Sequence, residues 1–267
     1  MPLMLLVLGL GGCGPTLQRY DAPPPGAERR VIRNADGVAV LSYLRAGPPE
    51  ARRLIFVHGT PGDATNYLDF LARPPAGWQV LSVDRPGFGQ SRPGAGDDTL
   101  TFAGQAAALL ALLGEAAGEK PVLVGHSLGG PIVLRAAADH PEKVGGVVVL
   151  AGSVDPALER PRWYNHLGAL PPVSFFLSRG LSRSNREIFA APEQTRRLAG
   201  VLDQVVCPVA VVQGGKDTLV PPANAAFLLE NLPHARRVEL WLLPEAGHFL
   251  PWENADTVRR AIDWASR

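Results

Sequence analysis

The sequence predicts an α/β fold in which a mostly parallel sheet carries helices on both faces. Short apolar runs alternate along the chain with longer helical stretches, and this alternation favours parallel βαβ units. The length of 267 residues suits one large domain of this class. A content of 46% hydrophobic and 19% charged residues is typical of a globular protein and excludes a disordered chain or a coiled coil.

Seven short apolar runs bounded by turn residues predict strands. They cover Val38–Leu44, Leu54–Val57, Val80–Val83, Val122–Val124, Val144–Leu150, Val209–Val212 and Val238–Leu243. Longer stretches predict helices at Thr99–Leu113, Pro131–Asp139, Ala223–Asn231 and Asp256–Ser266. Residues 152–199 break the alternation, because they are rich in Pro, Arg and aromatic residues. We expect an insertion there, lying over the carboxyl edge of the sheet within a domain of residues 31–267.

The first residues indicate a targeting signal. The apolar stretch Leu3–Leu10 is followed by small residues and Cys13, and eight residues are too short to span a bilayer as a helix. Leu10-Gly11-Gly12-Cys13 resembles the lipobox of bacterial lipoproteins. The resemblance implies a signal in residues 1–13, acylation of Cys13, a flexible tether in residues 14–30 and anchoring in a bacterial cell envelope. The alternatives are a soluble periplasmic or secreted protein and a cytoplasmic one.

Charge and cysteine content exclude several classes of protein. The 26 Lys and Arg residues are balanced by 25 Asp and Glu residues, giving a net charge of +1, and no basic stripe for nucleic acid is present. Two cysteines cannot build a disulfide framework or a four-thiolate zinc site. If Cys13 is acylated, Cys207 has no partner, and its apolar surroundings predict a buried, inert thiol.

A nucleophile is indicated by the motif GHSLG at residues 125–129, which follows an expected strand and precedes an expected helix. This context is that of a nucleophile elbow, in which Ser127 is exposed at a sharp turn. A serine hydroxyl needs an adjacent base. His248, in a Gly-His pair after the last strand, is the candidate. Asp217, after the preceding strand, is the candidate acid that orients it, and Asp155 is a rival.

Backbone donors for a developing oxyanion are expected in two places. The Leu128 amide follows the nucleophile at a helix N-terminus. The second donor should come from the loop HGTPG at residues 58–62, which begins with His58. Pro61 has no N–H, so the Thr60 amide is the candidate.

Five motifs in order resemble the α/β-hydrolase superfamily: HGTPG, DRPGFGQS, GHSLGG, GGKDTLVPP and EAGHFLPWE. The resemblance covers roughly residues 35–265. It implies an eight-stranded, mostly parallel sheet, a helical cap after the sixth strand, and a triad of Ser127, Asp217 and His248 that uses no cofactor and no metal. Dehalogenase and epoxide hydrolase relatives carry an aspartate nucleophile, so Ser127 argues against both activities.

The expected activity is that of a serine hydrolase cleaving a small-molecule carboxylic ester through an acyl-enzyme. A carbon–carbon bond hydrolase, an amidase or iminopeptidase, and a non-catalytic envelope binding module are the alternatives. The insertion is expected either to line an apolar acyl pocket or to pack onto the sheet with its aromatic residues. The pocket candidates are Trp163, Tyr164, Phe175 and Phe176, with His58 and Phe249 from the main domain. Its arginines would suit an acidic substrate or an anionic lipid headgroup.

Overall fold

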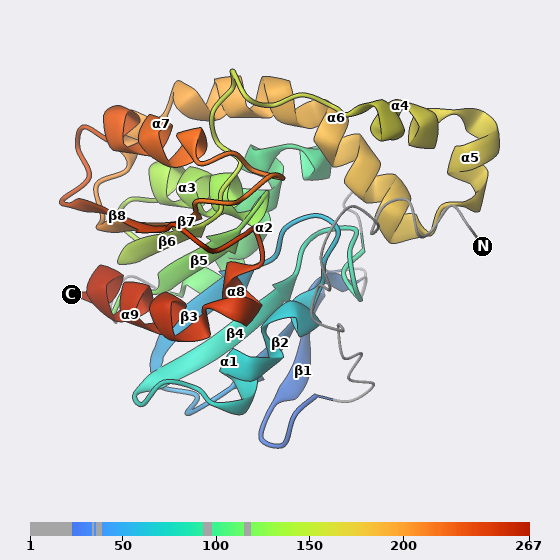
Figure 1. Cartoon of the computed structure of the whole chain (residues 1–267). Helices are drawn as coiled ribbons and strands as arrows, with labels where there is room; N and C mark the ends of the chain where they lie inside the picture. Colours follow the sequence, from blue (N-terminus) through green and yellow to red (C-terminus); the bar gives the residue numbers. More distant parts are fainter. Residues whose placement is uncertain (1–22, 34, 36–38, 93–97, 115–118) are drawn as a thin grey trace.

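The computed structural model describes residues 23–33, 35, 39–92, 98–114 and 119–267. Within them, an eight-stranded sheet has the order β1-β2-β4-β3-β5-β6-β7-β8. Neighbouring strands are parallel except for the pairs β1–β2 and β2–β4, so β2 runs against the others. The expected fold class is confirmed, with helices flanking the sheet (Figure 1).

Most expected strands and helices are present, with boundaries shifted by a few residues. The strands are β1 Glu28–Arg33, β2 Ala39–Ala46, β3 Arg52–Val57, β4 Trp78–Asp84, β5 Val122–His126, β6 Gly146–Leu150, β7 Val209–Gly214 and β8 Val238–Leu243. The helices are α1 Leu68–Ala72, α2 Phe102–Leu113, α3 Gly129–Asp139, α4 Trp163–Ala169, α5 Pro171–Phe176, α6 Arg179–Ala199, α7 Ala223–Asn231, α8 Leu250–Glu253 and α9 Ala255–Ser266.

Alternate residues of the central strands build two cores on opposite faces of the sheet. Ile55 and Val57 of β3 belong to a buried cluster with residues of α2, α3 and α7. Leu54 and Phe56 of the same strand belong to a second cluster with α1 and α9. Figure 1 shows α3 and α7 on one side of the sheet and α9 on the other. Burial on both faces explains why these strands read as continuous apolar runs.

Strand β1 departs from the expected organisation, because it begins at Glu28, inside the stretch 14–30 expected to be a tether. Its sequence ERRVIR has no apolar periodicity, and only Arg29 and Ile32 are partly buried. Pairing with β2, which sets Glu28 opposite Arg45, makes this segment the edge strand of the sheet. Residues 1–13, with the expected acylation site Cys13, lie outside the described residues.

The insertion forms three helices, α4, α5 and α6, between β6 and β7, and we call residues 152–199 the cap. The Ser178 hydroxyl accepts the Leu181 amide and begins the 21-residue helix α6. Asn165 of α4 and Asn185 of α6 hydrogen-bond to each other twice, each time at 3.0 Å. Figure 1 shows α4 and α5 at one extremity of the molecule, away from β8.

Candidate active site

Ser127 occupies the sharp turn that joins β5 to α3. Its φ of 54° lies in the left-handed region, which non-glycine residues adopt at a cost and mostly at functional turns. The Ser127 amide donates to the Leu150 carbonyl of β6 at 2.9 Å, which ties the turn to the sheet. A Cβ on Gly129 would lie 2.1 Å from the Val57 carbonyl oxygen, so the last position of GHSLG requires glycine.

Asp217 and His248 follow the carboxyl ends of the adjacent strands β7 and β8. His248 Nδ1 lies 2.7 Å from Asp217 Oδ2, and both residues are buried. The other carboxylate oxygen of Asp217 accepts the amides of Leu219 and Val220, each at 2.9 Å. These bonds hold the carboxylate in one orientation. An ionised carboxylate can accept hydrogen bonds but cannot donate them. The proton between the two residues is therefore carried by Nδ1 of His248, and Nε2 of His248 is left as the basic nitrogen.

The rival acid Asp155 has a different role. Its side chain accepts the Ala157 amide two residues further on at 2.9 Å, and its own amide donates to Asn224 Oδ1 at 2.9 Å. This is the local turn geometry typical of aspartate. The structure therefore places Asp217, and not Asp155, against His248.

His126, beside the nucleophile, contacts the base through its backbone. His126 Nε2 lies 2.9 Å from the His248 carbonyl oxygen, and the two imidazole rings are 4.7 Å apart. Because a carbonyl only accepts, Nε2 of His126 carries the proton. Burial, reinforced by the neighbouring His248, lowers the pKa of His126 to about 3. His126 is therefore a neutral donor, and it links the Ser127 turn to the His248 segment. The motif alone did not indicate this contact.

The loop of residues 58–62, which we call the oxyanion loop, lies directly against the nucleophile. A Cβ on Gly59 would be 2.7 Å from the Ser127 Cβ, so the loop backbone touches the serine side chain. Leu128, whose amide is the first expected donor, is the N-cap residue of α3. Thr60 Oγ1 is buried and has no hydrogen-bond partner among the described residues. The structure therefore brings the oxyanion loop, which contains the expected donor Thr60, against the residue that precedes the other expected donor, Leu128.

His58 is fully buried and is engaged by the protein through both ring nitrogens. The Arg85 amide donates to Nε2 at 3.1 Å, so Nδ1 carries the proton and donates to the Gly59 carbonyl at 2.7 Å. Burial is the main cause that holds the pKa of His58 well below its usual value. We expected His58 to line a substrate pocket. The structure instead buries it inside the protein, where it contacts the Gly59 carbonyl of the oxyanion loop and the Arg85 amide.

Arg85, within DRPGFGQS, is the largest fully buried side chain of the described residues. Its guanidinium donates to both carboxylate oxygens of Glu187 in α6, at 2.8 and 3.0 Å. It also donates to the Gly59 carbonyl at 2.8 Å and to Gln105 Oε1 at 2.5 Å. The preceding Asp84 is equally buried and accepts the amides of Ala64 and Gln90. Sequence reasoning missed the Arg85–Glu187 pair, since nothing local marks Glu187.

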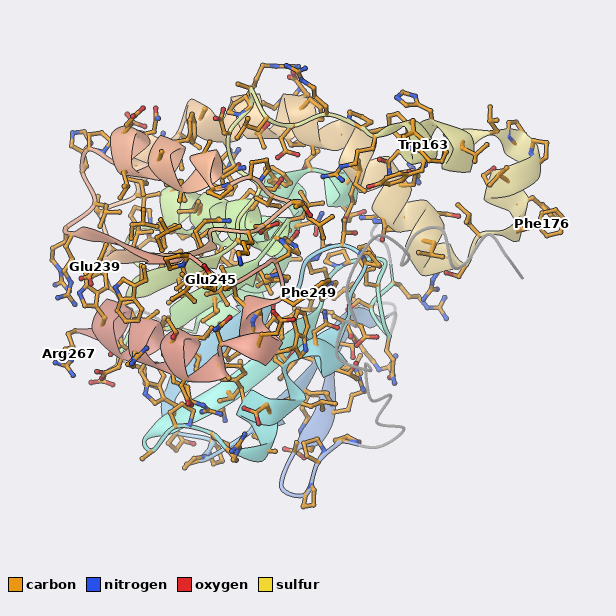
Figure 2. The ribbon with its side chains drawn as sticks, in the orientation of Figure 1. Trp163, Phe176, Glu239, Glu245, Phe249 and Arg267 are labelled. Carbon is orange, nitrogen blue, oxygen red and sulfur yellow. The ribbon has the colours of Figure 1, made fainter. Side chains whose placement is uncertain are left out.

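Three of the four cap aromatics expected in a pocket are largely exposed. Phe175 and Phe176 are each 84% exposed, and Trp163 is 65% exposed. Figure 2 shows Phe176 pointing outward at the extremity of the molecule. Tyr164 is partly buried, with its ring 5.8 Å from that of Trp163. Among the expected pocket residues, Phe249 does lie at the site, because its ring is 5.8 Å from His248.

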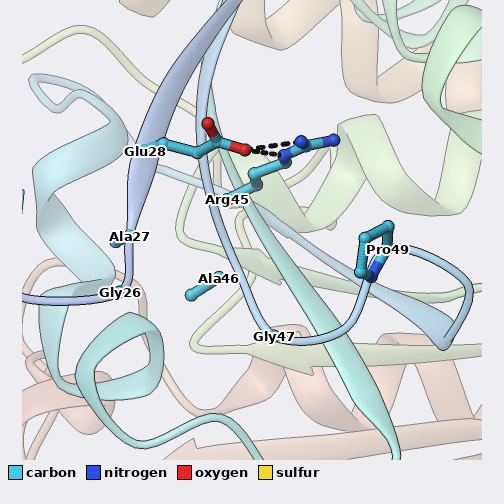
Figure 3. Close-up of a pocket in the computed structure, with 7 residues that line it drawn as sticks. All are labelled: Gly26, Ala27, Glu28, Arg45, Ala46, Gly47 and Pro49. Carbon is cyan, nitrogen blue, oxygen red and sulfur yellow. Dashed lines mark hydrogen bonds and ion pairs between the residues drawn. The ribbon is translucent and has the colours of Figure 1, made fainter.

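A hollow of about 290 Å³ lies beside β1 and β2, at the other end of the sheet from β7 and β8. Figure 3 shows its lining residues. The hollow is lined by Gly26, Ala27, Glu28, Arg45, Ala46, Gly47 and Pro49. Ala46 pairs with Val80 near the start of β4, whereas Ser127, Asp217 and His248 follow the ends of their strands. Among the residues that the structure describes, no cluster of His, Cys, Asp or Glu is arranged to hold a metal ion. None of the described helices is long and apolar enough to traverse a bilayer.

Comparisons with known proteins agree with this fold. A family model for the alpha/beta hydrolase fold matches residues 52–176. The crystal structure of a monoacylglycerol lipase from Paleococcus ferrophilus superposes with a TM-score of 0.63 at 22% identity, covering 85% of this chain and 98% of that one. At this identity, the likeness concerns the fold.

Three curated relatives extend the similarity over most of the chain. The dihydrolipoyllysine-residue acetyltransferase component of the acetoin cleaving system from Pseudomonas putida is 26% identical, over 85% of this chain and 66% of that protein. A 2-hydroxy-6-oxononadienedioate/2-hydroxy-6-oxononatrienedioate hydrolase from Burkholderia vietnamiensis is 24% identical, over 78% and 85%. A pimeloyl-acyl-carrier-protein methyl ester esterase from Neisseria meningitidis is 27% identical, over 75% and 88%.

The sheet topology and these matches define the fold class. The chain has the α/β-hydrolase fold.

Proposed function

We propose that this α/β-hydrolase is a serine hydrolase that cleaves a carboxylic ester through an acyl-enzyme. The observation that carries the proposal is the 2.7 Å contact between His248 Nδ1 and Asp217 Oδ2 at the sheet edge where Ser127 occupies a left-handed turn. Nucleophile, base and acid follow in the chain order typical of α/β-hydrolases. The methyl ester esterase among the relatives supports the choice of an ester.

In the proposed reaction, Ser127 Oγ attacks the ester carbonyl carbon while His248 Nε2 takes the hydroxyl proton. The negative charge that develops on the carbonyl oxygen is held by the Leu128 and Thr60 amides. His248 then donates its proton to the leaving alkoxide, and an alcohol departs. Water attacks the acyl-enzyme with His248 again as base, which releases the acid and restores Ser127. Asp217 keeps His248 in the required tautomer throughout.

The test is turnover of p-nitrophenyl esters of increasing chain length by the full chain. We expect Ser127→Ala to lose at least about 10⁴-fold in kcat and to lose labelling by a fluorophosphonate probe. Ser174→Ala, in the cap, serves as the matched control and should retain both. Full turnover by Ser127→Ala would contradict the proposal, and absence of both turnover and labelling in the unmodified chain would favour the non-catalytic binding module.

A second candidate is hydrolysis of a carbon–carbon bond by the same triad. One relative is named for a 2-hydroxy-6-oxo dioate, a compound without an ester or amide, so its hydrolysis must break a carbon–carbon bond. Assaying 2-hydroxy-6-oxononatrienedioate and an N-terminal prolyl amide beside the esters separates the candidates. Fluorophosphonate labelling without ester turnover would move the assignment to whichever of these two compounds is consumed.

We also propose that the chain is anchored to a bacterial envelope membrane through an acyl group on Cys13. The apolar stretch Leu3–Leu10 followed by Leu10-Gly11-Gly12-Cys13 supports this proposal. In a bacterial host fed radioactive palmitate, we expect labelling and membrane association of the unmodified chain and loss of both in Cys13→Ser. Cys207→Ser is the control, because that thiol is buried. Persistence of labelling in Cys13→Ser would contradict the anchor.

A further inference from the structure

The outermost part of the cap is apolar and exposed. Helix α5 buries none of its six residues. Leu170, just before it, is 51% exposed, and Phe175 and Phe176 are each 84% exposed. We call residues 170–176 the cap tip. Large apolar side chains that gather on a surface typically mark an interaction site, and Figure 2 shows Phe176 pointing away from the rest of the protein.

The architecture of the cap holds the tip in this exposed position. Helix α4 is tied to α6 by the two hydrogen bonds between Asn165 and Asn185. A Cβ on Gly168 of α4 would meet the Leu177 side chain at 3.7 Å, so Leu177 packs beneath the helix. The chain between these contacts turns outward, and the Phe175 and Phe176 rings contact each other at 5.5 Å. The tip is therefore presented by a supported scaffold.

The charges around the tip indicate which partner suits it. Residues 163–178 contain no Asp, Glu, Lys or Arg. Arginines flank this uncharged stretch on both sides, and residues 160–186 contain five of them and no acidic residue. Arg160, Arg162 and Arg179 are exposed. An aromatic, apolar insert bordered by cations matches the interface of an anionic bilayer, where rings enter the headgroup boundary and arginines meet lipid phosphates.

We propose that the cap tip is a membrane-docking surface that inserts Phe175 and Phe176 into the interface of a bilayer containing anionic phospholipid. Docking requires neither the triad nor acylation of Cys13, so it stands or falls independently of the proposed ester hydrolysis and of the proposed anchor. Trp163, at the start of α4 and next to Arg162, is also exposed. A second copy of the chain is the competing occupant, and sedimentation velocity distinguishes it from a bilayer.

The test uses the full chain with Cys13→Ser, in which a single new thiol reports insertion. Phe176→Cys is labelled with a nitrobenzoxadiazole dye, and Leu242→Cys, an exposed position on β8, is the matched control. Cys207 stays unlabelled, because burial raises the pKa of its thiol to about 12. With phosphatidylcholine–phosphatidylglycerol vesicles, we expect emission from the dye at position 176 to brighten and shift to shorter wavelength, with no shift at position 242. Vesicles of phosphatidylcholine alone should give a weaker response.

Co-sedimentation with the same vesicles provides a second measurement. We expect Phe175→Ser/Phe176→Ser to lower the partition coefficient about tenfold or more, whereas Leu229→Ser/Leu242→Ser leaves it unchanged. No emission shift at position 176, or equal shifts at both positions, would overturn the proposal. Equal responses to the two lipid mixtures would overturn the assignment of an anionic surface. A dimer in sedimentation velocity that Phe175→Ser/Phe176→Ser dissociates would assign the tip to a second copy instead.

Discussion

Arg85 and Glu187 form an ion pair through two parallel hydrogen bonds of 2.8 and 3.0 Å, with their side chains 1% and 3% exposed. Arg85 lies after β4 and Glu187 in the cap helix α6, 102 residues apart in sequence. The same guanidinium donates to the Gly59 carbonyl, next to the nucleophile. The Arg85 guanidinium therefore connects the cap to the oxyanion loop. A displacement of α6 would move Arg85 and, with it, the loop backbone that contacts Ser127.

Removing the anion of this pair should destabilise the fold. We expect Glu187→Gln to lower the free energy of unfolding by about 3 kcal/mol, because a buried guanidinium is left without a counter-charge. Urea denaturation measures the change. Glu193→Gln on the same helix is the control, since Glu193 forms only exposed pairs with Arg196 and Arg197 and should change stability by less than about 1 kcal/mol. The double variant Arg85→Met/Glu187→Leu should recover part of the loss, and equal losses in all variants would contradict a specific role for the pair.

Asp217→Asn should inactivate the enzyme through the tautomer of His248. The amides of Leu219 and Val220 both donate to Oδ1 of Asp217, so the oxygen of the new amide would stay with them. Its NH₂ group would then face His248 Nδ1, which could only accept, and the proton would move to Nε2. We expect kcat to fall about 10³- to 10⁴-fold with a small change in KM. Asp155→Asn, assayed in parallel, should retain most activity, and an equal loss there would reopen the choice of acid.

Two buried neutral histidines should make the protein sensitive to mild acid. The folded-state pKa is lowered to about 3 in His126 and well below its usual value in His58. The unfolded chain therefore binds more protons, and the stabilisation, complete above the unfolded pKa of about 6.5, decreases as the pH falls below it. Between about pH 7 and pH 5, His126 alone should account for about 2 kcal/mol of lost stability.

Urea unfolding of His126→Gln at both pH values checks this contribution. A glutamine NH₂ can still donate to the His248 carbonyl, but it does not titrate. The loss of stability between the two pH values should therefore shrink by about 2 kcal/mol. His234→Gln is the control, because His234 lies in an exposed turn. An unchanged pH dependence in His126→Gln would show that this histidine does not resist protonation.

Gly59→Ala should damage catalysis more than stability. The new methyl group would lie 2.7 Å from the Ser127 Cβ, so the oxyanion loop must move away from the nucleophile and take the Thr60 amide with it. Loss of one such donor costs about 10²- to 10³-fold in kcat, and we expect a loss of this size. Gly180→Ala, in α6, meets nothing within 4 Å and is the control for adding a methyl group. A Gly59→Ala variant with unaltered kcat would place the second donor elsewhere.

Local patterns in the sequence predicted the alternation of strands and helices and the spacing of GHSLG, Asp217 and His248. Both strands that precede Asp217 and His248 lie next to each other in the sheet, so the two residues share an edge. Strand β1 was missed because ERRVIR carries no apolar alternation. This segment is a strand because its backbone pairs with β2. Such pairing between two segments is not visible in the local sequence of either one.

The sequence by itself determined the α/β class and the candidate triad, since apolar runs, turn residues and a five-residue motif are local properties of the chain. Tertiary structure decided which acid faces His248, the pairing of Arg85 with Glu187, the internal position of His58 and the exposure of Phe175 and Phe176. Each of these depends on what another segment brings alongside. The sequence alone does not show whether an aromatic residue in an insertion is buried or exposed. Its burial depends on whether another segment packs against it, and that is decided by the tertiary structure.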